Sequence, residues 1–170
     1  MIMYVLAVSA IVLDQAVKWT IKHSMTLHQS IPVIKNFLHI SYVTNTGMAF
    51  GMFPALSVVF KVVATLVVIS IIVVERMGKI NTRAEKIFFG MILGGAAGNL
   101  IDRYVFGKIT DFVDFRVFPV FNVADSFIFV GATLLFIIYF RNRKKTAAAE
   151  GAGKPGDTPA TPGRDGGIKQ

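Results

Sequence analysis

Four long apolar runs constrain the fold of this chain more than any other feature of its sequence. They cover about residues 2–21, 56–74, 87–104 and 121–140. A helix of about 20 predominantly apolar residues is long enough to cross the hydrocarbon core of a bilayer. The composition agrees, because 54% of the residues are hydrophobic and the mean hydropathy is +0.60, more than a soluble domain of 170 residues needs. The sequence therefore predicts an all-α membrane protein with four transmembrane helices.

The first apolar run is predicted to be a retained helix rather than a cleaved signal peptide. It has no basic region before it, and no convincing small-residue cleavage site is followed by a soluble mature domain. Asp14 and Lys18 lie four residues apart in its second half, so their side chains share one helical face. This spacing favours a structural ion pair.

The lysines and arginines indicate how the helices are oriented. Residues 75–86 and 141–145 contain four each, whereas the two opposite connections together contain four. Cytoplasmic connections are enriched in these residues, so both termini and the 75–86 loop are predicted to be cytoplasmic. The net charge of +8 follows from this distribution, and no nucleic-acid partner is predicted. Residues 1–145 are expected to form one membrane domain, followed by a Gly/Pro-rich, disordered cytoplasmic tail over 146–170.

Two local patterns predict structure within the membrane domain. Residues 38–43 and 109–118 alternate between apolar and polar side chains, which predicts short strands at the membrane surface. In the third apolar run Gly90, Gly94 and Gly98 recur every four residues. Small residues at this spacing let helix backbones approach closely, so we expect tight helix packing there rather than a ligand site.

Polar residues gather between positions 98 and 126, where they interrupt lipid-compatible sequence. Ionisable residues at a bilayer are costly, so each is a functional candidate. The alternation of residues 109–118 places Asp111 on an apolar face and Asp114 beside Arg116, as a surface pair. The helical spacing places Asn99, Asp102 and Arg103 on one face of a helix, and Asn122 and Asp125 on one face of the next. These two helix faces could close on Asp111.

Two carboxylates in a poorly solvated site cannot both ionise, so one can act as a base while the other keeps a proton. Such a pair can activate water for attack on a peptide carbonyl without a covalent intermediate. The sequence contains no HExxH metal helix, no GxSxG elbow and no cysteine. From the residues alone three hypotheses stay open: an aspartyl active site, an ion or proton pathway in a small transporter, and a structural polar network.

Five motifs in order resemble those of the lipoprotein signal peptidases, the bacterial type II signal peptidases. The resemblance covers about residues 4–140. Its motifs are Asp14-Gln15 with Lys18, Asn45-Thr46-Gly47 followed by Ala49-Phe50, Gly98-Asn99-Leu100-Ile101-Asp102-Arg103, Thr110-Asp111-Phe112, and Phe121-Asn122-Val123-Ala124-Asp125-Ser126.

The resemblance implies a four-helix inner-membrane aspartyl peptidase with an extracytoplasmic β-cradle and a short surface helix over the site. It implies cleavage of diacylglyceryl-modified prolipoproteins just before the lipidated cysteine, inhibition by globomycin-type cyclic peptides, and no metal or other cofactor. Asp111 and Asp125 match the catalytic pair, and Asp102 is the second choice for a catalytic acid. The supporting positions are Asn45, Asn99, Arg103, Asn122, Asp14 and Lys18. We expect a monomer in contact with membrane lipid, and a proton- or cation-coupled transporter is the alternative function.

Overall fold

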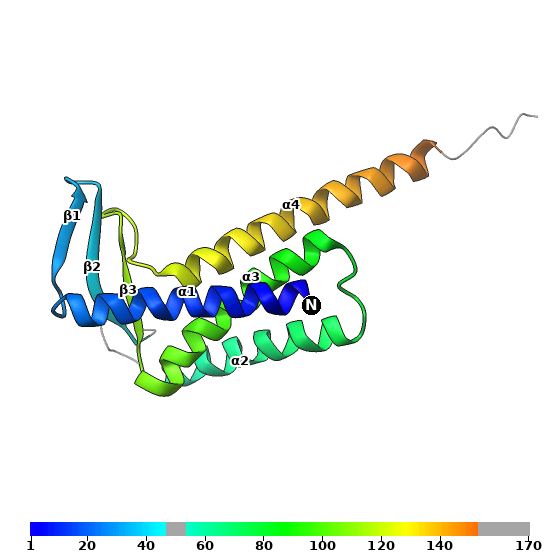
Figure 1. Cartoon of the computed structure of the whole chain (residues 1–170). Coiled ribbons are helices and arrows are strands. Elements are labelled where there is room, and N and C mark those ends of the chain that lie inside the picture. Colours follow the sequence, from blue (N-terminus) through cyan, green and yellow to red (C-terminus); the bar gives the residue numbers. More distant parts are fainter. Residues whose placement is uncertain (47–53, 153–170) are drawn as a thin grey trace, which may run out of the picture. The chain divides into compact units, whose positions relative to one another are not determined.

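The computed structural model describes the backbone of residues 1–46 and 54–152, and the side chains of 1–46 and 58–144. The chain divides into two compact units, Met1–Phe136 and Ile137–Gln170. Figure 1 shows the elements, in chain order α1 (Ile2–Ser24), β1 (Ser30–Ile34), β2 (Leu38–Asn45), α2 (Pro54–Arg76), α3 (Arg83–Ile101), the π-helical turn η1 (Asp102–Phe106), β3 (Ile109–Asp114) and α4 (Val123–Ala152).

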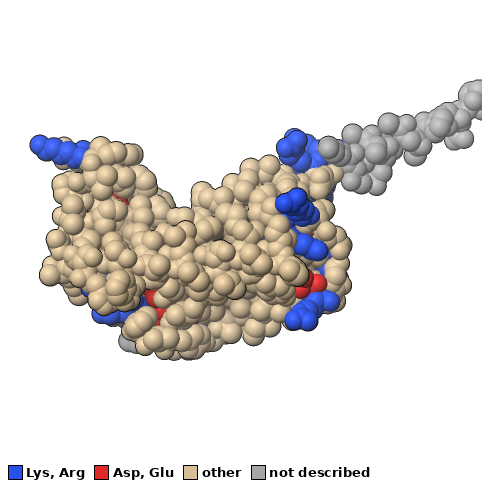
Figure 2. Space-filling model, viewed as in Figure 1, with Lys and Arg blue, Asp and Glu red and all other residues tan. Residues whose placement is uncertain are grey.

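Three helical segments are long and apolar enough to cross a membrane, namely Ile2–Ser24, Val58–Arg76 and Val123–Lys144. On the face shown in Figure 2, the surface over the middle of the helices carries almost no charged residues, and Lys and Arg gather toward their ends. The third predicted run corresponds to α3 and η1, which is not among the three segments. Its glycines Gly90, Gly94, Gly95 and Gly98 face α1 and α4.

The glycines of α3 allow the close helix packing that their spacing predicts. A Cβ atom added to Gly90 would lie 2.7 Å from the carbonyl oxygen of Met3, and one added to Gly94 would lie 2.6 Å from that of Ala7. Both contacts are with α1. Gly95 faces the other way, where a Cβ would meet the carbonyl oxygen of Ala124 in α4. Small residues on two faces thus let α3 pack directly on the backbones of α1 and α4.

Replacing Gly94 by alanine is expected to separate α1 from α3 and to destabilise the protein. The added methyl group meets backbone atoms that cannot rotate away, and overpacking of this kind costs about 1–3 kcal/mol. Thermal unfolding in detergent should show a lower melting temperature for Gly94→Ala than for wild type. Ser9→Ala, on the exposed side of α1, is the control and should unfold like wild type. An unchanged melting temperature for Gly94→Ala would contradict the packing argument.

The three strands form one antiparallel sheet in the order β1-β2-β3. Strands were predicted at 38–43 and within 109–118, and both are confirmed. The register pairs Val43 with Asp111, and it shifts between Ile40 and Val43. Phe112 packs against Ile21 and Met25, which attaches the sheet to the end of α1.

The predicted surface pair of Asp114 and Arg116 is only half correct. The two side chains do form an ion pair, with 3.3 Å between Nη1 and Oδ2, but Asp114 is only 7% exposed and also accepts a hydrogen bond from the Ser41 hydroxyl. The strand ends at Asp114, and Arg116 has a φ of 65°. The arginine therefore reaches Asp114 through a turn and not along one strand face.

Two predicted features fall partly outside the described residues. Within residues 1–46 and 54–152, the only short helical segment is η1, so the predicted surface helix over the site is not found among those residues. The motif residues Gly47, Ala49 and Phe50 lie in the range 47–53, which is not described.

In the second unit α4 continues to Ala152, seven residues beyond the predicted domain boundary at 145.

Candidate active site

The polar residues that the sequence singled out converge within the first unit. They come from six elements and from the residue that precedes α4. The contributions are Asp14 and Lys18 from α1, Asn45 from the end of β2, Asn99 from α3, Asp102 and Arg103 from η1, Asp111 from β3, Asn122 before α4 and Asp125 in its first turn.

Two asparagine side chains connect the carboxylates of Asp111 and Asp125. The Asn122 amide donates to Asp111 Oδ1 at 2.7 Å and to Asn99 Oδ1 at 3.1 Å. The Asn99 amide in turn donates to Asp125 Oδ1 at 2.7 Å. Because each amide both donates and accepts within this chain of bonds, its orientation is determined, and the two carboxylates are held at fixed positions.

Asp125 occupies the third helical position of α4, with Asn122 as the N-cap. The Asp125 N–H donates to Asn122 Oδ1 at 2.9 Å, and the Asn122 N–H donates to Asp125 Oδ2 at 3.3 Å. This reciprocal pair is a capping box. The Asp125 side chain thus also provides an acceptor for a backbone N–H group at the start of the helix. Asp125 is also only half-buried, so its carboxylate remains accessible.

Asp111 has a different environment. It is only 3% exposed, and burial raises the pKa of its carboxyl to about 6. A hydrogen bond from Asn45 Nδ2 to Oδ2, at 3.1 Å, opposes this shift, and the negative charge of Asp125 adds to it. The two carboxyl groups are therefore not equivalent, because Asp111 is buried in surroundings that favour its protonated form, whereas Asp125 is half-buried at the start of α4.

Lys18 forms a fully buried ionic triad with Asp14 and Asp102. Its Nζ is 2.7 Å from Asp14 Oδ2 and 3.1 Å from Asp102 Oδ2, and it donates to Asn99 Oδ1 at 3.0 Å. The predicted ion pair of Asp14 and Lys18 is thus confirmed, with Asp102 as a third member. The bond to Asn99 is the link between this triad and the asparagines that hold the catalytic candidates.

The two aspartates of the triad also hold the backbone beside the two candidate catalytic residues. Asp14 Oδ1 accepts a hydrogen bond from the Ala124 N–H at 2.9 Å, directly before Asp125. Asp102 Oδ2 accepts one from the Thr110 N–H at 3.1 Å, directly before Asp111. Lys18 therefore joins two carboxylates that each anchor one side of the site.

Gln15 is a site residue that the sequence reasoning did not select, although it stands in a quoted motif. Its Nε2 lies 3.2 Å from Asp14 Oδ2, 3.2 Å from Asp102 Oδ1 and 3.1 Å from the Gly98 carbonyl oxygen. It therefore bonds to both carboxylates of the triad and connects them to the backbone of α3. The only available signal was its place beside Asp14.

Arg103 is half-buried, and its charge interacts with Asp125, Asp111 and Asp102. It is positioned to balance the negative charge of the site. Among the described residues, no group of three or more His, Cys, Asp or Glu side chains is arranged to hold a metal ion.

The fold and this site define a multi-pass membrane protein whose paired carboxylates lie where its helices meet a small sheet. The family model described as "Signal peptidase (SPase) II" matches residues 6–141. The chain belongs to this family of bacterial membrane aspartic peptidases. The family excludes the transporter alternative.

The individual relatives agree with this assignment. The lipoprotein signal peptidase of Halothermothrix orenii is 41% identical over 141 residues, which cover 83% of this chain and 97% of the relative. That of Caldanaerobacter subterraneus subsp. tengcongensis is 43% identical over 140 residues, covering 81% and 95%. A solved structure of a bacterial membrane enzyme superimposes with a TM-score of 0.76 at 27% identity, covering 84% of this chain and 90% of that one.

Proposed function

We propose that Asp111 and Asp125 are the catalytic pair with which this signal peptidase II removes signal peptides from prolipoproteins. The family match over residues 6–141 supports the activity. The observation that carries the residue assignment is the hydrogen-bonded connection of the two carboxylates through Asn122 and Asn99. A gel-shift assay tests the activity: the purified chain should release the signal peptide from a diacylglyceryl prolipoprotein in the presence of a chelator. Absence of any release from the folded protein would contradict the proposal.

The environments of the two carboxyl groups assign their roles. Asp125, half-buried at the start of α4, takes a proton from water as the water oxygen attacks the scissile carbonyl carbon. Asp111 keeps its proton in the buried position and donates it to the developing oxyanion. When the intermediate collapses, the C–N bond breaks, the departing amine receives the proton held by Asp125, and the former carbonyl oxygen returns its proton to Asp111 as the C=O bond re-forms. Asn99 and Asn122 keep both carboxyl groups in place throughout.

The remaining polar residues are assigned supporting roles. Asp14, Lys18 and Asp102 position the backbone before each catalytic residue, through the bonds to Ala124 and Thr110. The oxygens of Asp102 are already bonded to Lys18, Gln15 and Thr110, which argues against its use as the catalytic acid. Asn45 orients Asp111, and Arg103 balances the charge of the site.

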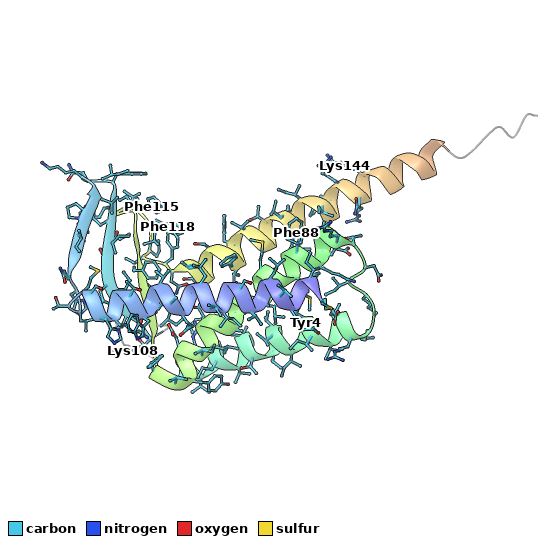
Figure 3. The ribbon with its side chains drawn as sticks, in the orientation of Figure 1. Tyr4, Phe88, Lys108, Phe115, Phe118 and Lys144 are labelled. Carbon is cyan, nitrogen blue, oxygen red and sulfur yellow. The ribbon has the colours of Figure 1, made fainter. Side chains whose placement is uncertain are left out.

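The proposed site faces the extracytoplasmic side, with α3 as the fourth transmembrane helix and the sheet as the cradle. In Figure 3, Lys108, Phe115 and Phe118 lie at the opposite end of the helices from Tyr4 and Phe88. The loop between α2 and α3, with Arg76, Lys79, Arg83 and Lys86, lies at the end marked by Phe88. The excess of positive charge assigns that end to the cytoplasm. Residues 1–145 then form the peptidase domain, which acts as a monomer without a cofactor, and globomycin-type peptides would compete at the same carboxylates.

Removing the acyl chains from the substrate is expected to weaken cleavage severely. The lipid on the cysteine places the scissile bond near the membrane surface, so its loss should raise KM and lower kcat/KM. The measurement compares a diacylglyceryl prolipoprotein with the same sequence lacking the modification, in one detergent. Equal turnover of both substrates would contradict the role of the lipid.

The stability of the protein should depend on pH through Asp111. Because its pKa rises from 3.8 to about 6 on folding, the folded chain binds this proton more tightly than the unfolded chain. The free energy of unfolding therefore falls as the pH rises through this interval, by roughly 3 kcal/mol. Asp111→Asn cannot ionise, so its melting temperature relative to wild type should increase between pH 4 and pH 7. A relative melting temperature that is the same at both pH values would contradict the shift.

A further inference from the structure

A cavity of about 520 Å³ opens beside Asp125, between the β3–α4 connection and α4. Figure 2 shows the surface hollowed between the sheet and the start of α4. We propose that this cavity binds one acyl chain of the substrate's diacylglyceryl group. The inference rests on the proposed peptidase function, and it assigns a binding site to the lipid part of the substrate.

One wall of the cavity is aromatic and comes from the connection before α4. Phe115 and Phe121 stack with their ring centroids 5.9 Å apart, and Phe118 meets Phe121 edge to face at 6.1 Å. Figure 3 shows Phe115 and Phe118 together on this connection. Because the rings pack on one another, the wall keeps its shape without a bound ligand.

The other wall is one face of α4. Asp125, Ser126, Phe129 and Val130 follow the helical spacing i, i+1, i+4 and i+5, so they lie along one side of the helix. The wall runs for about 7.5 Å along the helix axis, at 1.5 Å per residue. It begins at the proposed base and continues into the predicted span Val123–Lys144. A chain bound here would leave the reacting centre and enter the membrane.

The chemistry of the lining selects hydrocarbon over peptide. A peptide segment would bring N–H and C=O groups that need partners. The Ser126 hydroxyl already donates to the Asn122 carbonyl oxygen, and the Asp125 oxygens already accept from Asn99 and Asn122. The other lining side chains are Phe or Val, with Phe118 63% and Phe129 73% exposed, so the cavity is open and apolar. An acyl chain, which needs no hydrogen bonds, fits this lining.

A substitution that narrows the cavity tests the proposal. Its effect on KM is measured with two synthetic prolipoprotein peptides that have the same amino-acid sequence. One carries dihexanoylglyceryl cysteine and the other dipalmitoylglyceryl cysteine, and both are assayed in the same nanodiscs. Val130→Phe should raise KM for the dipalmitoyl substrate about tenfold, which corresponds to about 1.4 kcal/mol, with kcat little changed. KM for the dihexanoyl substrate should change little. Comparing each variant with wild type on the same substrate cancels differences in membrane partitioning.

The matched control is Val117→Phe, because Val117 is 90% exposed in the same region and does not line the cavity. It should leave both KM values unchanged. If Val130→Phe raises KM equally for both substrates, a peptide side chain occupies the cavity and the proposal is wrong. If neither KM changes, the cavity binds nothing in the reaction. Both outcomes leave Val130→Phe active, whereas failure of the proposed function would appear as wild-type protein that cleaves neither substrate.

A second measurement does not depend on a substitution in the cavity. A dipalmitoyl substrate analogue with a diazirine close to the ester carbonyl of one acyl chain should label Phe118 or Phe129 on irradiation. Labelling confined to α1 or α2 would overturn the proposal.

Discussion

Asp125→Asn and Asp111→Asn should each remain folded and lose cleavage by at least about 10³-fold, the scale of a lost general acid or base. Asparagine is nearly isosteric with aspartate, and its carbonyl oxygen can still accept the bonds from Asn99 and Asn122. It cannot take a proton from water at position 125 or donate one as a carboxylic acid at position 111. A gel-shift assay on a diacylglyceryl prolipoprotein measures the loss, and thermal unfolding in detergent checks the fold.

Asp114→Asn is the matched control for these two variants. Asp114 is also a buried aspartate, but its oxygens bond to Ser41 and Arg116 and to neither catalytic candidate. It should therefore cleave at a rate close to that of wild type. A folded Asp125→Asn protein that cleaves normally would remove Asp125 from the mechanism, and the same outcome at position 111 would remove Asp111.

Lys18→Met should be the most destabilising single change among the supporting residues. It leaves Asp14 and Asp102 buried without their cation, and breaking a buried ion pair in this way costs about 3–5 kcal/mol. For a chain of this length the melting temperature should fall by roughly 10 °C. Cleavage should fall as well, because the bonds to Ala124 and Thr110 position the residues next to the catalytic pair. Circular dichroism in detergent and the gel-shift assay measure the two effects.

The control for this prediction is Lys35→Met, which removes an exposed lysine beside the sheet. It should change neither the melting temperature nor cleavage. The double variant that combines Lys18→Met with Asp14→Asn adds a second comparison. It has less uncompensated buried charge than Lys18→Met alone, so it should recover part of the lost stability. If Lys18→Met unfolds and cleaves like wild type, the triad does not hold the site together.

The sequence predicted the helices and strands because their signals are local. Apolar run length predicted α1, α2 and α4, and alternation predicted β2 and β3. The end of β3 was missed, because the positive φ of Arg116 belongs to a turn that alternation does not indicate. The ion pair of Asp14 and Lys18 was predictable for the same reason as the helices, since its partners lie one helical turn apart.

The arrangement of the site was decided by tertiary structure. Asp14 bonds to a backbone amide 110 residues later in the chain, and no local pattern reports such a contact. The burial of Asp114 and the contacts of Gln15 likewise depend on elements that meet only in the folded protein. The different environments of Asp111 and Asp125 arise in the same way, because burial and a helix terminus act on a carboxyl group only once the chain has folded around it. By itself, therefore, the sequence determined the helices, the strands and the polar residues proposed for the site, because these signals are local, and the tertiary structure decided how each of those residues is buried and bonded.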